Sequence, residues 1–244
     1  SNAITYVESA INKGLDPNKF GQRISFFFNS HNGFLEEISK FRAARKLWAS
    51  IMKNRFGVKN KKALMCRFHV QTGGSTLTAS QIDNNIVRTT LQAMSAVLGG
   101  AQSLHTNSKD EAISLPTDDA ARLALRTQQI IAHESGVINH PDPFGGSDII
   151  ENMTEDIIKK ANKIMTEIDS IGGAVSAIEQ SFIQDQIANS AYNYQKLIDS
   201  KEKIVVGVNK FRESESLSGE LLKKNEKKTY QQIKKIQAIK QSRN

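Results

Sequence analysis

The stretch ALMCRFHVQTGG at residues 63–74 decides the fold class of this chain. Residues 63–70 are rich in apolar side chains, and the run is too short for a helix and stops just before Gly73 and Gly74. A short apolar run bounded by turn residues is typical of a buried strand in a parallel sheet. Segments 33–56 and 86–98 on either side have the apolar spacing of helices. The sequence therefore predicts helix, strand and helix in succession.

The same pattern continues in both directions along the chain. Further strands are predicted at 23–28 and 101–105, and a late one at 203–208. Thr117 is a suitable N-cap for a helix that runs to about Glu134, and the chain beyond it is mostly helical. Alternating strands and helices favour an α/β architecture with a parallel sheet, either doubly wound or part of a barrel. About three core strands are too few for a closed eight-stranded barrel, which needs roughly 250 residues.

Composition and charge narrow the class of protein. The 244 residues are 39% hydrophobic and 24% charged, which is ordinary for a globular chain. No apolar run approaches the roughly 20 residues that cross a bilayer, so we expect no membrane partner. The single cysteine, Cys66, excludes an intramolecular disulfide and favours the cytoplasm. It lies in an apolar run, where an inert thiol is expected.

The net charge of +8 is concentrated at the end of the chain. Residues 219–244 hold eight Lys or Arg against two Glu, which is +6, and their apolar residues recur mostly every third position. The pattern predicts a basic amphipathic helix after a polar linker at 211–218. A solvated helix, an acidic partner surface and, least favoured, nucleic acid are the alternatives. Residues 1–3 are interpreted as the remnant of an expression tag.

Polar side chains follow each predicted strand. They are neutral amides, hydroxyls and imidazoles far more often than charges, which suits a ligand rich in amides and hydroxyls. The sets are Asn29, Ser30, His31 and Asn32; His69, Gln71, Thr72, Gly73, Gly74, Ser75 and Thr76; and Gln102, Ser103, His105, Thr106, Asn107 and Ser108. No zinc spacing and no phosphate-binding glycine signature occurs, so no metal site is predicted. Each histidine could instead be a structural residue.

Several short stretches of this chain resemble one protein family, both in their amino-acid sequence and in their order along the chain. They are RFHVQTGGSTLT at 67–78, NNIVRT at 84–89, GGAQSLHTN at 99–107 and DEA at 110–112, together with RISFF at 23–27, FRAARKLW at 41–48, RTQQII at 126–131, ESG at 134–136, DPFGGS at 142–147 and VGVNK at 206–210. They resemble the large subunit of the adenosylcobalamin-dependent acyl-CoA mutases, best known from methylmalonyl-CoA mutase. The resemblance covers nearly the whole chain.

The resemblance implies a fold and a set of partners. Residues 4–210 would be the C-terminal part, about the last three βα units, of a substrate-binding (β/α)8 barrel of the TIM type, followed by a helical C-terminal extension. The family binds an acyl-CoA through the barrel and adenosylcobalamin over its carboxyl end, against a separate cobalamin-binding domain. The expected partners are the acyl-CoA, the remaining half of the barrel and a cobalamin-binding subunit in an oligomer, with no nucleic acid.

The resemblance also implies roles for individual residues. His69 and Gln71 would be the catalytic residues facing the cofactor. Arg23, Ser25, Gln102 and Ser103 would bind the substrate. Gly74, Glu111 and Ser114 would contact the cobalamin together with His69 and Gln71. The family has alanine at the position of Ser114, and many members have Gly-Trp where this chain has Gly73 and Gly74. At Ser114 and Gly74 the sequence therefore departs from the family motif.

The sequence also lacks parts of the family pattern. The Asp-x-His-x-x-Gly motif, whose histidine ligates cobalt in the family, does not occur in it. The earlier half of the barrel does not occur in it either. We therefore expect a subunit or fragment of methylmalonyl-CoA mutase that interconverts (R)-methylmalonyl-CoA and succinyl-CoA only when assembled and is inactive alone. The alternatives are an isobutyryl-CoA or 2-hydroxyisobutyryl-CoA mutase subunit, or a non-catalytic scaffold.

Overall fold

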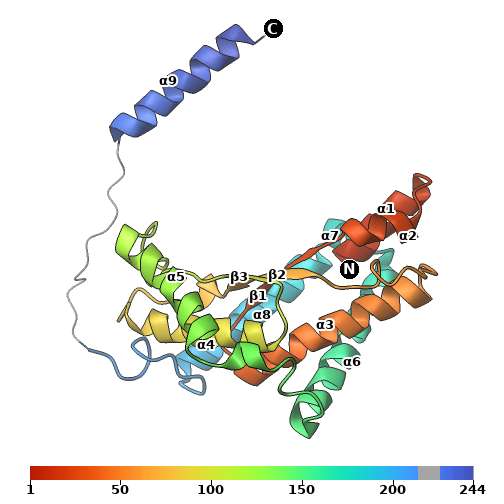
Figure 1. Ribbon diagram of the computed structural model, residues 1–244, viewed down its shortest axis with the longest axis horizontal. Coiled ribbons are helices and arrows are strands. Elements are labelled where there is room, and N and C mark those ends of the chain that lie inside the picture. Colours follow the sequence, from red (N-terminus) through yellow and green to blue (C-terminus); the bar gives the residue numbers. More distant parts are fainter. Residues whose placement is uncertain (214–225, 244) are drawn as a thin grey trace.

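A three-stranded parallel sheet lies at the centre of the computed structural model, which describes residues 1–213 and 226–243 (Figure 1). The strands are β1 (Phe26–Ser30), β2 (Phe68–Thr72) and β3 (Ser103–His105), in the order β1-β2-β3. Both pairings are parallel, with Phe27 opposite His69 and His69 opposite Ser103. The predicted parallel α/β arrangement is thus confirmed, while closure of a barrel stays a prediction.

Helices connect the strands and extend beyond them. Helix α3 (Phe34–Asn54) follows β1, and α4 (Asn84–Leu98) follows β2. The remaining helical elements are α1 (Asn2–Asn12), α2 (Pro17–Phe20), η1 (Gly21–Arg23), η2 (Gly74–Thr76), α5 (Asp118–His133), η3 (Val137–Asn139), α6 (Asp148–Ile171), α7 (Ala174–Glu179), α8 (Phe182–Asp199) and α9 (Glu226–Ser242).

The hydrophobic core lies between one face of the sheet and helices α3 and α4. Phe68 and Val70 of β2 are buried there together with Phe41 of α3 and Ala96 of α4. The Phe41 and Phe68 rings stack with centroids 5.3 Å apart. Aromatic side chains bury large apolar areas, so this cluster is the main source of stability of the sheet and its helices.

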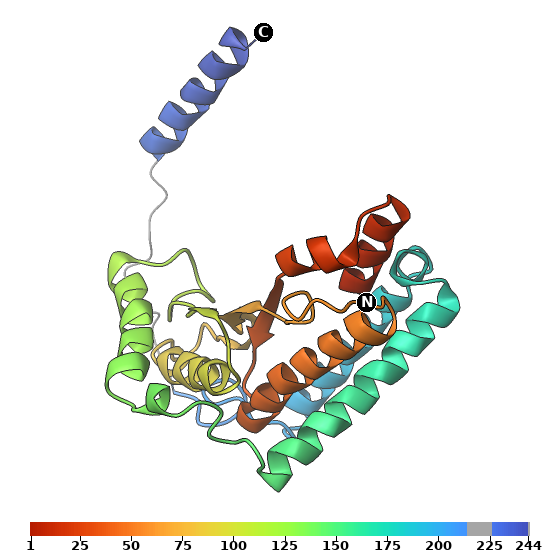
Figure 2. The ribbon, with the colours of Figure 1, turned by 45° about the vertical axis from the view of Figure 1, so that its right-hand side comes forward.

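Helix α6 packs along α3, as Figure 2 shows, and ion pairs join the two. Arg42 of α3 donates to Asp142 at 2.5 Å and to Glu151 of α6 at 2.5 Å. Arg55, at the end of α3, reaches both Glu8 of α1 and Asp169 of α6. The Arg55 pairs are exposed and each contribute little energy, whereas the Arg42 side chain is largely buried. Together they fix α6 and α1 relative to α3.

The other face of the sheet is open. Along β1, Phe27 is 65% exposed, whereas Phe26 and Phe28 pack against the core. Parallel sheets are ordinarily covered on both faces. A sheet covered on one face therefore indicates that further protein or a ligand lies over the open face.

Several sequence predictions need correction. The strands begin later than expected, at Phe26, Phe68 and Ser103. Residues 21–23 form a short 3-10 helix before β1, and residues 61–64 form a turn before β2. The strand predicted at 203–208 is wrong: only a single bridge between Val206 and Lys210 forms there. Asn209 explains the turn, because its side chain bonds to the backbone of Ile198, Lys203 and Val205.

The end of the chain is described in part. The predicted basic helix of 219–244 is helical over Glu226–Ser242, with Tyr230, Ile233, Ile236 and Ile239 all exposed. Most of the predicted linker, 214–218, and the predicted start of that helix lie outside the described residues. None of the described helices is both long and apolar enough to span a bilayer.

Cys66 is 5% exposed just before β2, and burial raises the pKa of its thiol to about 11, from an ordinary value of 9.0, with nearby Arg45 opposing the shift. Between about pH 9 and 11 the unfolded chain loses this proton while the folded chain keeps it. The free energy of unfolding should therefore fall as the pH rises through this window. Urea titrations at pH 8 and 10.5 should show a larger loss for the wild type than for Cys66→Ala. Equal losses would contradict the assignment.

Candidate functional site

The alternation of side chains along the strands places most of the predicted site residues on the open face of the sheet. Phe27, His69 and Ser103 form one row across the three strands. Asn29, Gln71 and His105 form the next row toward the carboxyl ends. The open face thus presents amide, imidazole and hydroxyl groups in two parallel rows.

His69 is held from two sides. Its Nδ1 lies 2.7 Å from Ser103 Oγ, and the Phe27 ring lies with its centroid 5.2 Å away, tilted by 46°. Because Nδ1 bonds to the serine, Nε2 is the nitrogen left for a ligand. Two of the predicted residues, His69 and Ser103, are therefore brought into direct contact.

Gln71 is fixed by the loop that follows β3. Its Nε2 donates to Asn107 Oδ1 at 2.9 Å. Asn107 is itself held by Thr72, because its backbone N–H donates to Thr72 Oγ1 at 2.9 Å and its Nδ2 donates to the Thr72 C=O at 3.0 Å. The Gln71 amide group is therefore oriented by buried partners, and its Oε1 can accept a hydrogen bond from a ligand.

Gly74 and Glu111 lie side by side just beyond the carboxyl end of β2. A Cβ atom on Gly74 would come within 3.0 Å of Asn107 Nδ2 and 3.4 Å of Glu111 Oε1. A larger residue at position 74 would therefore require Asn107 to shift by a few tenths of an ångström. Ser114 follows in the same loop, where its Oγ donates to the Leu115 C=O at 2.9 Å.

A buried glutamine that the sequence analysis did not single out organises the loops after β1 and β2. Gln92 of α4 is 1% exposed. Its Oε1 accepts from the Gly73 N–H at 2.8 Å, and its Nε2 donates to Asn32 Oδ1 at 2.6 Å and to Thr76 Oγ1 at 2.7 Å. The signal in the sequence was a long polar residue on a helix face that also carries Ala93 and Ala96.

A second missed residue, Asp110, ties the loop after β3 to the start of α5. Burial alone would raise the pKa of Asp110, but hydrogen bonds from the Thr117 N–H at 3.0 Å and from Thr117 Oγ1 at 3.3 Å lower it below the ordinary value. Thr117 is also the side-chain cap of α5, as predicted. A carboxylate therefore fixes the loop that carries Glu111 and Ser114.

The remaining predicted residues lie toward the amino ends of the strands. Arg23 ends the short helix η1, and Ser25 precedes β1; both are exposed. Gln102 turns to the backbone, with its Oε1 accepting from the Phe68 N–H at 2.7 Å and its Nε2 donating to the Gly100 C=O at 2.8 Å. Arg23, Ser25 and Gln102 therefore lie just before the strands, and His69 and Ser103 lie in the first row within them. Gln71 lies nearer the carboxyl ends, and Gly74, Glu111 and Ser114 follow the strands.

Comparison with known proteins identifies the family. The fold and the site define an α/β unit with its polar groups on one open sheet face. The family model described as "Methylmalonyl-CoA mutase" matches residues 1–244. The chain belongs to the methylmalonyl-CoA mutase family, whose members are isomerases.

Individual relatives support this assignment. The chain is 50% identical over 215 residues, 88% of its length, to the "2-hydroxyisobutanoyl-CoA mutase large subunit" of Aquincola tertiaricarbonis. It is 43% identical over its whole length to the "Probable methylmalonyl-CoA mutase, mitochondrial" of Caenorhabditis elegans, and 42% identical to the "Methylmalonyl-CoA mutase, mitochondrial" of Homo sapiens. It covers 38%, 33% and 32% of these relatives respectively, so it spans about a third of their length.

Within residues 1–213 and 226–243, no group of three or more His, Cys, Asp or Glu is placed to hold a metal ion.

Proposed function

We propose that this chain is the last part of the substrate-binding barrel of an adenosylcobalamin-dependent acyl-CoA mutase, contributing about three βα units. The observation that carries the proposal is the parallel sheet with one face packed on α3 and α4 and the other face exposed and polar. A barrel has this asymmetry in every βα unit, because helices cover the outside and side chains line the inside. The barrel would be completed by a polypeptide that supplies the other strands.

The substrate proposed for this sheet is an acyl-CoA that lies along the strands. A five-residue strand spans roughly 16 Å, and the site residues lie along that length, from Arg23 and Ser25 before β1 to Gly74 and Glu111 beyond the carboxyl end of β2. Arg23 and Ser25 offer a guanidinium and a hydroxyl that suit phosphate oxygens at the amino end. His69 and Ser103 offer hydrogen bonds in the first row of the sheet, and Gln71 offers them nearer the carboxyl end. An elongated ester with a phosphorylated end and a small reacting end fits this separation.

The residues beyond the carboxyl end fit the cobalamin that the family implies. The bare backbone at Gly74 leaves room that a Cβ atom would fill, and Glu111 and Gln71 present oxygen atoms to amide or hydroxyl hydrogens. When bound, the cofactor would supply the radical chemistry that rearranges the carbon skeleton. The role of this chain would be to bind the cofactor's edge, to orient His69 through Ser103 and to exclude water.

The proposed reaction is the interconversion of (R)-methylmalonyl-CoA and succinyl-CoA, carried out in the cytoplasm by the assembly with the other barrel half and a cobalamin-binding subunit. The relative named 2-hydroxyisobutanoyl-CoA mutase, at 50% identity, makes a 2-hydroxyisobutyryl ester the second candidate substrate.

The test is an isomerisation assay with adenosylcobalamin, comparing this chain alone with mixtures that supply the missing barrel strands and a cobalamin-binding subunit. Methylmalonyl-CoA and 2-hydroxyisobutyryl-CoA would be assayed separately. Turnover in the mixture alone supports the proposal and identifies the substrate. Absence of both turnover and cobalamin binding in every mixture would favour a structural role.

Replacing Arg23 by alanine is expected to weaken binding of the CoA ester in the active mixture by about 1.5 to 3 kcal/mol, because a charge-assisted contact is lost. Equilibrium binding of the ester would measure the effect. Arg122→Ala is the matched control, since Arg122 lies on α5 and pairs with Asp119. Unchanged ester affinity in Arg23→Ala would contradict the assigned role.

A further inference from the structure

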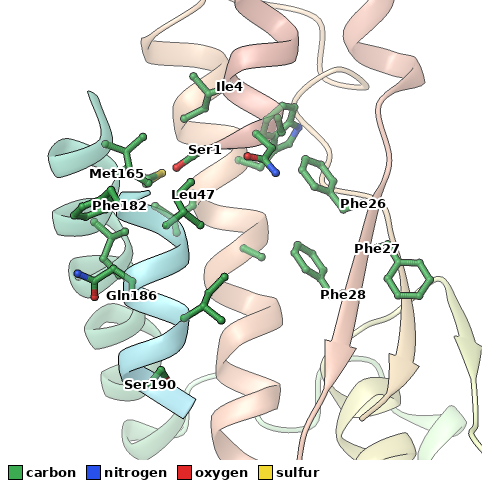
Figure 3. Close-up of a pocket in the computed structure, with 18 of the residues that line it drawn as sticks. Ser1, Ile4, Phe26, Phe27, Phe28, Leu47, Met165, Phe182, Gln186 and Ser190 are labelled. Atoms are coloured by element: carbon green, nitrogen blue, oxygen red, sulfur yellow. The ribbon is translucent and has the colours of Figure 1, made fainter. Parts of the chain in front are cut away.

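A polar cluster around Arg88 of α4 lies apart from the apolar groove of the molecule. Figure 3 shows that groove, which side chains of β1, α3 and α8 line, among them Phe28, Leu47 and Phe182. The proposed barrel accounts for the groove, because the missing part of the barrel would fill it. Arg88 does not line it, and neither the core nor the site described above accounts for this arginine.

The guanidinium of Arg88 joins α4 to two other segments of the chain. Its Nη1 donates to Asn85 Oδ1 at 2.7 Å and to Thr78 Oγ1 at 3.0 Å, and its Nη2 donates to the Val206 C=O at 2.7 Å. These acceptors are neutral oxygens, so the three bonds are not ion pairs. An arginine suits the position because its planar fork bonds two segments at once, which the single nitrogen of a lysine cannot do.

Asn85 connects Arg88 to the loops that follow β2 and β3. It is fully buried, and its Oδ1 also accepts from the Thr78 N–H at 3.1 Å. Its Nδ2 donates to the Thr78 C=O and to the Lys109 C=O, both at 2.9 Å. Thr78 lies in the loop after β2, and Lys109 lies two positions before Glu111 in the loop after β3. Arg88 and Asn85 therefore tie both loops to the start of α4.

Residues 203–211 form a strap that reaches Arg88 from the far end of the described body. The side chain of Asn209 fixes the turn of this strap by bonding to three backbone groups. The strap also meets the loop after β2 at Gln81, whose Nε2 donates to the Phe211 C=O at 3.0 Å. Gly207 permits this approach, because its φ is +80° and a Cβ atom there would come within 2.9 Å of Gln81 Oε1.

We propose that the strap positions the loops after β2 and β3 through Arg88, so that Arg88 is a positioning residue for Gly74 and Glu111. The inference rests on the proposed function, because these two residues are the ones assigned to the cobalamin. With the strap in place, the guanidinium is held by an acceptor on each side. Without the strap it loses the Val206 C=O and turns toward water, and its bonds to Asn85 and to the loop after β2 weaken.

Hydrogen exchange of the full chain, followed at single amides, measures this coupling. The reporter is the Thr78 amide, whose bond to Asn85 breaks when the loop after β2 loosens. Gly207→Ala pushes the strap away from Gln81. Gly14→Ala is the matched control, because Gly14 has nearly the same φ of +82° and nothing lies within 4 Å of its Cβ position.

Gly207→Ala and Arg88→Lys are each expected to speed exchange at Thr78 by about tenfold or more, since each breaks the link between strap and loop. The double variant should be no faster than the faster single variant, because both changes act through one guanidinium. Arg55→Lys is the second control: Arg55 also joins two segments, α1 and α6, away from these loops. Both controls should keep the wild-type rate at Thr78.

Two outcomes of the exchange experiment would overturn the proposal. One is an unchanged rate at Thr78 in Gly207→Ala, or effects of the two variants that multiply in the double variant. The other is equal acceleration at the Thr78 amide and at the amide of Val70, which is fully buried in β2, since this would mean general destabilisation instead of a local coupling.

Cofactor affinity in the mixtures described above tests the positioning role. Gly207→Ala should weaken binding of adenosylcobalamin and leave the affinity for methylmalonyl-CoA unchanged, because the proposed anchor of the ester, Arg23, lies before the strands. Faster exchange at Thr78 with unchanged cobalamin affinity would overturn the positioning role. Wild-type mixtures that bind no cobalamin would remove the proposed function, whereas the exchange rates would still decide whether the strap holds the loop.

Discussion

Replacing Phe68 by alanine should lower the free energy of unfolding by about 3 to 5 kcal/mol, which is the usual cost of removing a buried phenylalanine side chain. Phe68 is 2% exposed, and its ring lies between Phe28 and Phe41 with centroids 5.3 Å from each. The neighbouring rings belong to a strand and a helix, so the cavity cannot collapse without moving both. Urea titration followed by the fluorescence of the single tryptophan, Trp48, would measure the loss.

Phe27→Ala is the matched control, because it makes the same change in the same sheet on the open face. Phe27 is 65% exposed, so its removal should cost less than about 1 kcal/mol. The difference between the two variants tests whether the sheet is packed on one face only. Equal losses would mean that the open face is covered in solution, and the site described above would then not be accessible.

The fold could be predicted from the sequence where the apolar pattern was strong. The run before Gly73 and the helical spacing on either side of it indicated a parallel α/β sheet, and Thr117 was identified as a helix cap. Strand limits were less accurate, because residues 61–64 turn before β2 begins. The strand expected at 203–208 failed because the side chain of Asn209 bonds to three backbone groups, an effect that hydrophobicity alone does not reveal.

The roles assigned to the site residues stay predictions, and the structure shows only where these residues lie. The open face brings His69 and Ser103 together, and Gly74 lies beside Glu111. What the sequence did not indicate is the support behind these residues. Gln92 acts on loops that are 16 or more positions away in the chain, and a polar residue in a helix is ordinarily assigned to solvent. Only the packing of α4 under the sheet shows that this amide is buried.

Gln92→Leu should lower the free energy of unfolding by about 2 to 4 kcal/mol, although leucine has a similar size. The Gly73 N–H would lose its acceptor in a buried position, and Asn32 and Thr76 would each lose a donor. A buried polar group left without a partner costs about 1 to 3 kcal/mol. The loops after β1 and β2 would also loosen, so turnover in the active assembly should fall more than affinity for the CoA ester, whose proposed anchor Arg23 lies at the other end of the sheet.

Gln128→Leu on α5 distinguishes loss of this network from loss of any glutamine. Gln128 makes one such bond, from its Nε2 to Thr106 Oγ1 at 3.0 Å, so its replacement should cost about 1 kcal/mol and leave the loop of Gly73 in place. Urea titration gives both stabilities, and hydrogen exchange at the Gly73 amide reports the loop directly. Faster exchange at Gly73 in Gln92→Leu alone is the expected result. If both variants were destabilised equally with unchanged exchange at Gly73, Gln92 would be an ordinary core residue, and the order of these loops would come from the strands themselves.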